Sequence, residues 1–347
     1  MALHWAVLIP AYQPDERLGQ LAQRLREQNI GVVVVDDGST GCAAAFAAAE
    51  QAGCTVLHHD GNRGKGRALK TGFAWLAQHG FDAAVTADAD GQHTAADILR
   101  VAAAMEAQPG RLILGARDVA QMPGKSRAGN SLTRALFSLL YGIHLQDTQT
   151  GLRGIPLGTR TQALLDMAGE RYEYEMNMLV YSGTLFGGIT EIPIETIYIN
   201  RNETSHFRPL RDGAKIYAVL LRHFPKFLIT SLLSFVLDYS LFALLYYTVA
   251  GSAAAATVGA RVVSATFNYL INKHFVFRST SKSYTALHYL ALAVCILLMN
   301  SGLMYLLVDR LGLPALVVKI FVEALMYLVS FAVQNNLASR GAAPAKK

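Results

Sequence analysis

The sequence predicts an α/β domain with a parallel sheet, followed by an all-α domain of four membrane-spanning helices. Two observations support this prediction. Short apolar runs alternate with helix-like segments over roughly the first 200 residues, which is typical of parallel strands joined by crossover helices. From Phe227 to Leu337 the composition changes to four long apolar stretches separated by short polar breaks.

Five short apolar runs in the first part of the chain are strand candidates. They are Trp5–Pro10, Gly31–Val35, Cys54–His58, Phe81–Thr86 and Arg111–Gly115. The helix candidates between them are Glu16–Gln28, Cys42–Gln51 and Lys65–His79, which gives the order β-α-β-α-β-α-β. A further helix is expected to begin after Thr94, whose hydroxyl can cap its first turn. In such a sheet, ligand sites lie beyond the carboxyl ends of the strands, where the polar clusters of this sequence fall.

The C-terminal part is expected to lie in a membrane. Hydrophobic residues make up 52% of the 347 residues and charged residues only 16%, which is unusual for a soluble protein. A helix needs about 20 apolar residues to cross the hydrocarbon core, and all four stretches reach that length. The predicted spans are Phe227–Val249, Ala253–Asn272, Ala286–Leu307 and Ala315–Asn335.

Basic residues next to the spans predict their orientation, because lysine and arginine are retained on the cytoplasmic side. Those between spans two and three and after span four are Lys273, Arg278, Lys282, Arg340, Lys346 and Lys347. The opposite loops offer only Arg310. The N-terminal run Leu3–Pro10 is too short for a span and lacks the features of a signal peptide. We therefore expect a multi-pass protein of the inner or plasma membrane, with the large domain and both termini in the cytoplasm.

The chain has a net charge of +6, and basic residues gather just before the first span, where Asn200 to Lys226 contain six basic and only two acidic residues. A basic patch in this place favours anionic lipid head groups over nucleic acid, and we assign Arg201 and Lys215 to the acceptor lipid. Apolar residues such as Ile216 recur there at helical spacing, which indicates a helix in the membrane interface; a solvated linker is the alternative. The expected domains are 1–200 (α/β), 201–226 (basic amphipathic interfacial segment), 227–338 (four spans) and 339–347 (basic cytosolic tail).

Asp88, Asp90 and Gln92 form an Asp-x-Asp-x-Gln motif directly after an apolar strand. In extended backbone, residues two apart face the same side, so these side chains can converge on a hard divalent cation that also takes phosphate oxygens. Such a cation would neutralise a departing diphosphate. An isolated Asp-x-Asp is usually a solvated turn. The preceding strand and the following Gly91 favour a metal site here.

Two further polar clusters follow a strand or open a helix. Asp36 and Asp37 begin an Asp-Asp-Gly-Ser segment, and their carboxylates can accept hydrogen bonds from a nucleobase or a ribose; a structural turn is the alternative. Lys65 lies in Gly61–Gly66, where a helix N-terminus with basic residues favours an anion. This segment lacks the Walker spacing, which excludes a P-loop ATPase, and a simple glycine turn is its alternative.

Arg117, Arg127 and Asn130 belong to polar clusters near the same crevice. The planar fork of arginine binds phosphate bidentately, so Arg117 and Arg127 are candidates for holding an acceptor phosphate; solvated surface arginine is the alternative. Glu173 and Glu175 are candidates for a general base or for positioning sugar hydroxyls. A base is not compulsory, because an acceptor phosphate is largely ionised at neutral pH.

Taken together, the motifs resemble family 2 glycosyltransferases of the dolichol-phosphate mannose synthase type, which have a GT-A (Rossmann-like) fold. The matching segments are Ile-Pro-Ala-Tyr, Asp-Asp-Gly-Ser, Asn-Arg-Gly-Lys-Gly, Ala-Asp-Ala-Asp-Gly-Gln-His and Asp-Thr-Gln-Thr-Gly-x-Arg. Residues 225–338 resemble the GtrA-like four-span domain, including Phe267–Lys273 and Phe275–Phe277. One departure from the family pattern is Gln13, because an acid often follows Pro-x-Tyr there; this leaves open which base is read.

The resemblance implies roles for individual residues. Asp88, Asp90 and Gln92 would hold Mg²⁺ or Mn²⁺. The nucleotide-binding set is Pro10, Ala11, Tyr12, Asp36, Asp37, Lys65, Asp88 and Ala89. The catalytic set is Asp90, Arg117, Arg127, Glu173 and Glu175, and the acceptor-phosphate and lipid set is Arg117, Arg127, Asn130, Arg201 and Lys215.

The expected activity is inverting, metal-dependent transfer of a hexose from GDP-mannose or UDP-glucose to dolichyl or undecaprenyl phosphate. Two alternatives remain. A processive polysaccharide synthase is disfavoured because such enzymes share a Gln-x-x-Arg-Trp motif, and neither Trp5 nor Trp75 follows an arginine. A flippase for lipid-linked sugars is disfavoured by the intact Asp-x-Asp-x-Gln motif. The sequence does not indicate the oligomeric state.

Overall fold

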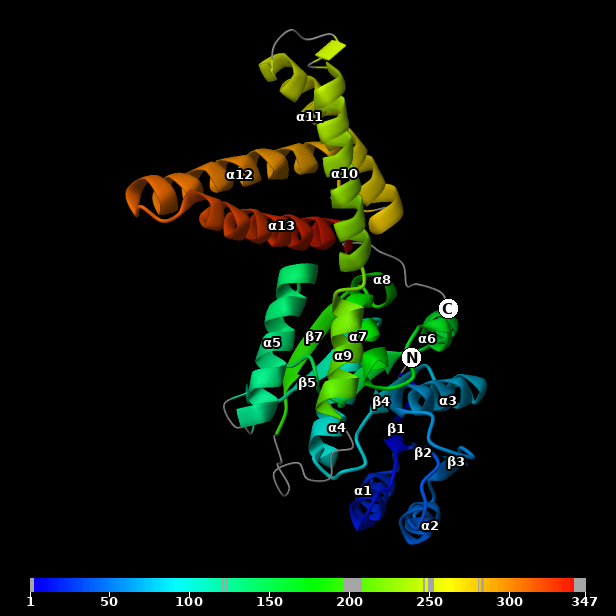
Figure 1. Ribbon diagram of the computed structural model, residues 1–347. Coiled ribbons are helices and arrows are strands. Elements are labelled where there is room, and N and C mark those ends of the chain that lie inside the picture. Colours follow the sequence, from blue (N-terminus) through cyan, green and yellow to red (C-terminus); the bar gives the residue numbers. More distant parts are fainter. Residues whose placement is uncertain are drawn as a thin grey trace. The chain divides into compact units, whose positions relative to one another are not determined.

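The computed structural model describes residues 3–119, 122, 124–195, 208–245, 247–248, 253–279, 281 and 284–339. These residues form two compact units (Figure 1). The first comprises described residues of 3–138 and 144–220, and the second comprises 139–143 and the described residues of 221–339.

The first unit is built on a seven-stranded sheet in the order β3-β2-β1-β4-β6-β5-β7. The strands are β1 (Trp5–Ala11), β2 (Val32–Asp36), β3 (Thr55–His58), β4 (Ala83–Thr86), β5 (Leu112–Ala116), β6 (Arg153–Pro156) and β7 (Ile189–Pro193). The five predicted strands are all present. These five, β1 to β5, run parallel to one another as predicted, and the sheet becomes mixed through β6, which lies antiparallel between β4 and β5.

Helices cover both faces of this sheet. They are α1 (Glu16–Glu27), α2 (Ala43–Gln51), α3 (Lys65–Gln78), α4 (Ala95–Ala107), α5 (Gly124–Tyr141), the 3₁₀ turn η2 (Gly158–Arg160), α6 (Thr161–Asp166), α7 (Tyr172–Val180), α8 (Ser182–Leu185) and α9 (Pro209–Leu220). The predicted cap of α4 is confirmed, because the Thr94 hydroxyl accepts a hydrogen bond of 3.0 Å from the Asp97 backbone N–H.

Alternation along β1 explains how the two helical layers attach. Val7 and Ile9 belong to the core cluster that also contains Leu18 of α1 and residues of α2 and α4. Leu8 is also fully buried, and α3 carries a glycine against it: a Cβ on Gly72 would lie 2.1 Å from Leu8 Cδ1. Successive side chains of a strand point to opposite faces, so β1 anchors a helical layer on each side.

The strand order reverses at β1. The chain passes from β1 to β2 and β3 on one side, and β4 then pairs with β1 on its other side. Because β1, β2 and β4 are parallel, their carboxyl ends meet at one edge of the sheet. A reversal of this kind leaves a crevice between the connections, where α/β proteins bind their ligands.

Helix α9, which lies within the interfacial segment predicted for 201–226, belongs to the first unit, and the membrane-interface role of that segment stays a prediction. The helix contacts α7, and Asp212 and Ile216 are buried. The Asp212 carboxylate pairs with Arg171, 3.1 Å away, which explains why this part of the basic segment folds onto the α/β domain. Residues 196–207, including Arg201, and the predicted tail at 340–347 lie outside the described residues.

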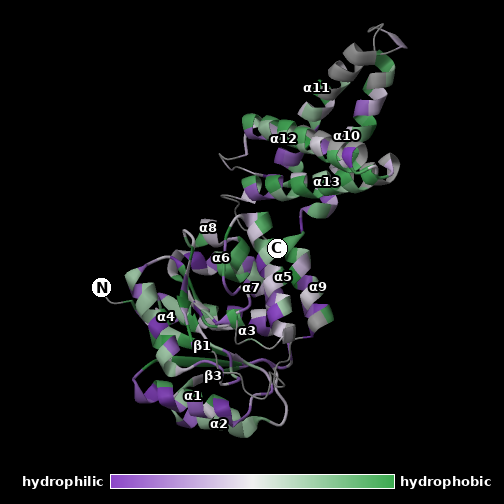
Figure 2. Ribbon diagram, turned by 90° about the vertical axis from the view of Figure 1, so that its left-hand side faces the viewer, coloured by the Kyte–Doolittle hydropathy of each residue, from purple (hydrophilic) through white to green (hydrophobic). Residues whose placement is uncertain are grey.

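The second unit is helical, and each predicted span coincides with a helix. Its elements are α10 (Phe224–Leu245), α11 (Ala253–Ile271), the π-helical turn η5 (Asn272–Val276), α12 (Ala286–Met304), the π-helical turn η6 (Tyr305–Arg310) and α13 (Ala315–Ser339). Figure 2 shows that hydrophobic residues dominate α10, α12 and α13. Within the described residues, α10 is long and apolar enough to cross a membrane, with a mean hydropathy of 1.9, whereas 286–300 forms a shorter apolar helix.

A network of amides and hydroxyls joins the helices of the second unit. The Asn272 side chain, fully buried, accepts a hydrogen bond from Thr230 of α10 at 2.8 Å and donates to Asn268 at 2.8 Å. It also donates to Gln334 of α13, which in turn accepts from Tyr284. Buried polar groups need such partners, so the network fixes which helix faces meet.

Candidate active site

A cavity of about 270 Å³ lies at the carboxyl ends of β1, β2 and β4. Its lining consists of Pro10, Ala11, Tyr12, Gln13, Pro14, Asp15, Arg17, Asp37, Asn62, Gly64, Lys65, Ala68, Asp88, Ala89, Asp90, Arg171 and Tyr172. The polar clusters that the sequence places after three strands therefore share one cavity. Most of the predicted nucleotide-binding residues, together with Asp88 and Asp90, lie in its wall.

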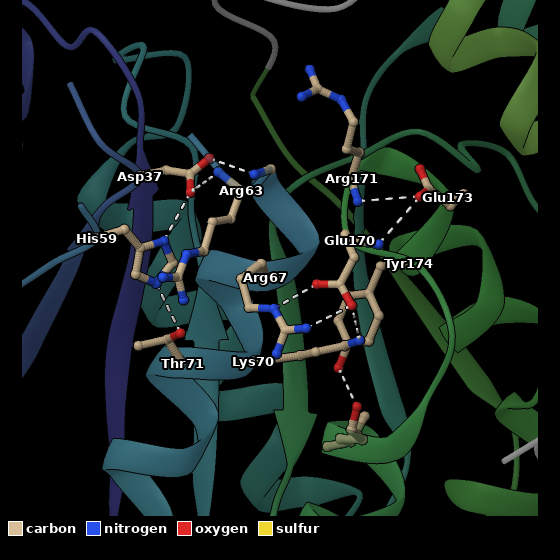
Figure 3. Close-up of polar contacts among 12 residues, drawn as sticks. Asp37, His59, Arg63, Arg67, Lys70, Thr71, Glu170, Arg171, Glu173 and Tyr174 are labelled. Atoms are coloured by element: carbon tan, nitrogen blue, oxygen red, sulfur yellow. Dashed lines mark hydrogen bonds and ion pairs between the residues drawn. The ribbon is translucent and has the colours of Figure 1, made fainter. Parts of the chain in front are cut away.

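Asp37 anchors the loop that leads into α3. Its carboxylate accepts hydrogen bonds from the backbone N–H groups of Arg63 at 2.9 Å and Gly64 at 2.7 Å (Figure 3). His59 holds the same carboxylate at 2.9 Å and is itself held by Thr71 at 2.9 Å. A network this complete sets the shape of the cavity wall before any ligand arrives.

Asp36, in contrast, does not line the cavity that the described residues form. Its carboxylate bonds the backbone N–H of Ser39 at 2.8 Å and the ring of His58 at 3.0 Å. Burial opposes its ionisation, but the hydrogen bonds from His58 and Ser39 outweigh that effect and lower the pKa of Asp36. Asp36 thus fastens the β2–β3 end of the sheet.

Lys65 and Asp88 form an ion pair inside the cavity. The Lys65 Nζ lies 2.7 Å from Asp88 Oδ1 and 3.1 Å from Glu175 Oε2. Burial works against the ammonium charge, but Asp88 and Glu175 outweigh it and raise the pKa of Lys65. The backbone of Gly151 lies against the other side of the carboxylate, since a Cβ there would come within 2.2 Å of Asp88 Oδ2.

Asp90 lies beside Asp88 and has fewer direct partners. Its Oδ1 accepts a hydrogen bond of 3.0 Å from the Gln92 backbone N–H. Burial and the neighbouring charge of Asp88 raise the pKa of Asp90. Among the described residues, the Gln92 side chain is not part of the cavity wall.

Two carboxylates, those of Asp88 and Asp90, are available to a divalent cation in the cavity. Within the described part of the chain, no three His, Cys, Asp or Glu side chains gather into a ready-made metal cage. Mg²⁺ is commonly held by one or two carboxylates together with substrate phosphates and water, so this donor set fits such an ion. His93, which the motif contains but to which we gave no role, stands 3.6 Å from Asp88 and has a buried ring nitrogen without a partner among the described residues.

Several residues of the cavity wall have no assigned role in the sequence prediction. Arg171 and Tyr172 begin α7, and Arg17 and Asp15 pair at 2.5 Å at the start of α1. The segment before α7 is tied to α3, because Glu170 holds Arg67 at 2.6 Å and Lys70 at 3.3 Å (Figure 3). The high density of polar residues around residue 171 is the feature of the sequence that could have indicated a functional role for Arg171.

The residues predicted to hold the acceptor phosphate do not line this cavity in the described structure. Arg117 pairs bidentately with Asp147, at 2.6 and 3.2 Å, and Asp147 is fully buried. Arg127 is exposed on α5 and donates to the Met122 carbonyl. Asn130 is buried and accepts a hydrogen bond from Thr148.

The two candidate bases are also held by internal partners. Glu173 caps the start of α7 by accepting from the backbone N–H groups of Glu170 and Arg171, and Lys215 of α9 approaches it at 3.6 Å. Glu175 is buried between Lys65 and the fully buried Arg153. Neither glutamate is among the described residues that line the cavity, so their catalytic roles stay predictions.

Comparison with known families identifies both parts of the chain. Residues 6–168 match the model "Glycosyl transferase family 2", and residues 226–338 match the model "GtrA/DPMS, transmembrane domain".

Curated relatives are similar over the first part of the chain. One is the undecaprenyl-phosphate mannosyltransferase of Micrococcus luteus, 31% identical over 201 residues, which covers 54% of this chain and 81% of the relative. Another is the UDP-N-acetylglucosamine–dolichyl-phosphate N-acetylglucosaminyltransferase of Methanococcus voltae, 27% identical over 213 residues, covering 55% of this chain and 85% of the relative.

A solved structure supports the fold. Glucosyl-3-phosphoglycerate synthase from Mycobacterium tuberculosis superposes with a TM-score of 0.50 at 18% identity, covering 63% of this chain and 79% of that one. The first unit therefore has the GT-A, Rossmann-like fold. The protein is a family 2 glycosyltransferase that carries a GtrA/DPMS-type transmembrane domain in the same chain.

Proposed function

We propose that this protein transfers a hexose from a nucleotide sugar, GDP-mannose or UDP-glucose, to a polyprenyl phosphate such as dolichyl or undecaprenyl phosphate. The observation that carries the proposal is the cavity at the strand ends, where Asp37, Asp88, Asp90 and Lys65 meet. The same chain continues into a transmembrane domain. This domain keeps the enzyme at the membrane, which contains lipid acceptors. The activities named for the Micrococcus luteus and Methanococcus voltae relatives support this choice of acceptor.

The nucleotide is proposed to bind between the ends of β1 and β2. Tyr12 is partly exposed there and offers a ring face, and Asp37 lies in the same wall. The N-terminus of α3, at Lys65 in the cavity wall, carries the partial positive charge of a helix start, which favours phosphate, while the N–H groups of Arg63 and Gly64 before it donate to Asp37. This arrangement would leave the diphosphate next to Lys65 and Asp88.

We propose that Asp88 and Asp90 hold Mg²⁺ or Mn²⁺ together with the diphosphate. The ion supplies positive charge that stabilises the diphosphate leaving group. Lys65 orients Asp88 through their 2.7 Å contact, and Gly151 leaves room for that carboxylate. The Asp88 carboxylate is therefore already oriented on one side of the cavity before a ligand binds.

The acceptor phosphate is already a nucleophile at neutral pH, so the reaction needs no general base. An acceptor oxygen forms a bond to the anomeric carbon while the bond to the diphosphate breaks, and direct displacement inverts the configuration. Arg117 and Arg127 remain candidates for holding the acceptor phosphate. The basic residues between spans two and three and after span four predict that this chemistry takes place on the cytoplasmic side.

Purified full-length protein should be incubated with labelled nucleotide sugars, polyprenyl phosphate and Mn²⁺ or Mg²⁺, and the lipid extract analysed. We expect one donor to give a lipid-linked monosaccharide whose formation stops when the metal is chelated. Absence of a lipid-linked product with every donor would overturn the proposal. A growing polymer would instead identify a processive synthase.

A further inference from the structure

Helix α9 connects to the cavity wall through one ion pair. Asp212 of α9 is fully buried, and its Oδ1 accepts a hydrogen bond of 3.1 Å from Arg171 Nε. Its Oδ2 accepts one of 2.8 Å from the Arg208 backbone N–H, which fixes the carboxylate on its own helix. The position of Arg171 therefore depends on α9.

Arg171 lies beside the loop before α3, close to the place proposed for the diphosphate. It lines the cavity, and its Nη1 donates to the Asn62 side chain, 3.3 Å away, in the loop before α3. Figure 3 shows its side chain extending away from the Glu170 network. Among the described residues, its Nη2 makes no hydrogen bond, so this nitrogen is left to donate to a ligand.

Of the other two cations of the cavity, Lys65 is more fully committed, whereas Arg17 keeps one buried nitrogen, Nη1, without a partner among the described residues. Lys65 lies between Asp88 and Glu175, and Arg17 gives two of its nitrogens to Asp15. Arg171 gives only Nε to its carboxylate partner. With Nε bonded to Asp212 and Nη1 to Asn62, the Arg171 guanidinium keeps Nη2 for phosphate, to which arginine binds strongly.

We propose that Arg171 binds phosphate oxygens of the ligand in this cavity, and that Asp212 is the positioning residue that holds Arg171 in place. The proposal rests on the proposed function for the nature of the ligand. It makes α9, the helix that precedes the first transmembrane helix in sequence, part of the substrate-binding apparatus.

The test uses the full-length protein in detergent and measures kcat and KM for the nucleotide sugar and for polyprenyl phosphate separately. The variants are Arg171→Gln, Asp212→Asn and their combination, with Arg24→Gln and Asp166→Asn as charge-matched controls outside the cavity wall. Asp212→Asn keeps an acceptor for the Arg208 N–H while it removes the charge.

Arg171→Gln should raise one of the two KM values by about 10- to 100-fold, the effect of losing a hydrogen bond between charged groups. Asp212→Asn should raise the same KM by a smaller factor, and the combined variant should match Arg171→Gln alone. A rise confined to the nucleotide sugar assigns the phosphate to the donor, and one confined to the lipid assigns it to the acceptor.

Unchanged KM values in Arg171→Gln would overturn the phosphate contact. Effects of the two substitutions that multiply in full, or an Asp212→Asn variant that changes only stability, would overturn the positioning role. Calorimetric titration with UDP and GDP separates this proposal from the overall function. If no donor gives product but Arg171→Gln still weakens diphosphate binding, the proposed function fails and the role of Arg171 stands.

Discussion

The cavity at the strand ends and the arginine cluster around Arg117 differ in what surrounds their charged side chains. In the cavity, Asp37, Asp88 and Asp90 lie in one wall that remains open to a ligand. Around Arg117, the guanidinium grips a fully buried aspartate, Asp147, within the protein. Both regions contain polar motifs that the sequence marks as functional.

This difference shows that the order of strands predicts which side chains lie close together. The type of a residue predicts less well whether its side chain is exposed to a ligand. Strands β2 and β4 both lie parallel beside β1, so their carboxyl ends, followed by Asp37 and Asp88, meet at one edge of the sheet. An arginine in a polar segment can face either a phosphate or a buried counter-charge. Which of the two it faces depends on its partner in the folded chain. For Arg117 this partner is Asp147, 30 positions further along the sequence.

The largest effect is expected at the metal-binding side of the cavity. Asp90→Asn removes one of the two carboxylates available to a cation, and it should lower the rate of lipid-linked sugar formation by about 100- to 1000-fold, as for loss of a preorganised electrostatic group. Asp166→Asn, on α6 outside the cavity wall, is the control. Near-normal turnover in Asp90→Asn would show that the cavity does not use this carboxylate.

At the arginine cluster, the main effect should fall on stability. Arg117→Ala leaves the Asp147 charge buried without its main partner, which should cost about 3 kcal/mol. Thermal unfolding of the purified protein should show a clear drop in Tm. Exposed Arg127→Ala should change it little. If Arg117→Ala keeps its Tm and loses only affinity for polyprenyl phosphate, the cluster is an acceptor site and the contrast with the cavity disappears.

A backbone substitution tests how tightly the cavity is built. In Gly151→Ala the new Cβ would clash with the Asp88 carboxylate, so we expect a loss of activity of about 10-fold through displacement of this group. Gly183→Ala, where a Cβ meets nothing within 4 Å, is the matched control. Equal activity of the two variants would mean that Asp88 tolerates movement.

The smallest effect concerns pH and the Asp36–His58 contact. Because the folded pKa of Asp36 is lowered, its ionised form stabilises the protein above the unfolded pKa of about 3.9, and this contribution is lost as pH falls through the folded value. Tm measured between pH 3 and 7 should therefore fall less steeply at the acid end for Asp36→Asn than for the unchanged protein. Parallel curves would assign the acid sensitivity to other groups.

Much of the first unit follows from local patterns. The apolar runs predict β1 to β5, and Thr94 predicts the start of α4. Local patterns do not predict strand β6. Its sequence, Arg-Gly-Ile-Pro, does not alternate between apolar and polar residues and contains a single β-branched residue. It becomes a strand because it fits between β4 and β5, with Arg153 fully buried and Gly154 leaving room for Met105.

The site shows the same division. Side chains that follow strands were predictable, since the sheet brings them together. Arg171 and Asp212 lie 41 positions apart and meet only because α9 folds onto α7. A periodic sequence pattern does not predict an ion pair of this kind. In the sequence, Arg171 is one arginine in a loop and Asp212 is one acid in a basic segment.

The attachment of α9 also determines where the chain can be cut. A fragment ending near residue 200, the predicted end of the α/β domain, would discard α9 and leave Arg171 without its buried partner. A fragment that continues through Leu220 retains Asp212 and ends immediately before the second unit. Fragments intended for crystallisation or ligand screening should therefore keep the whole helix.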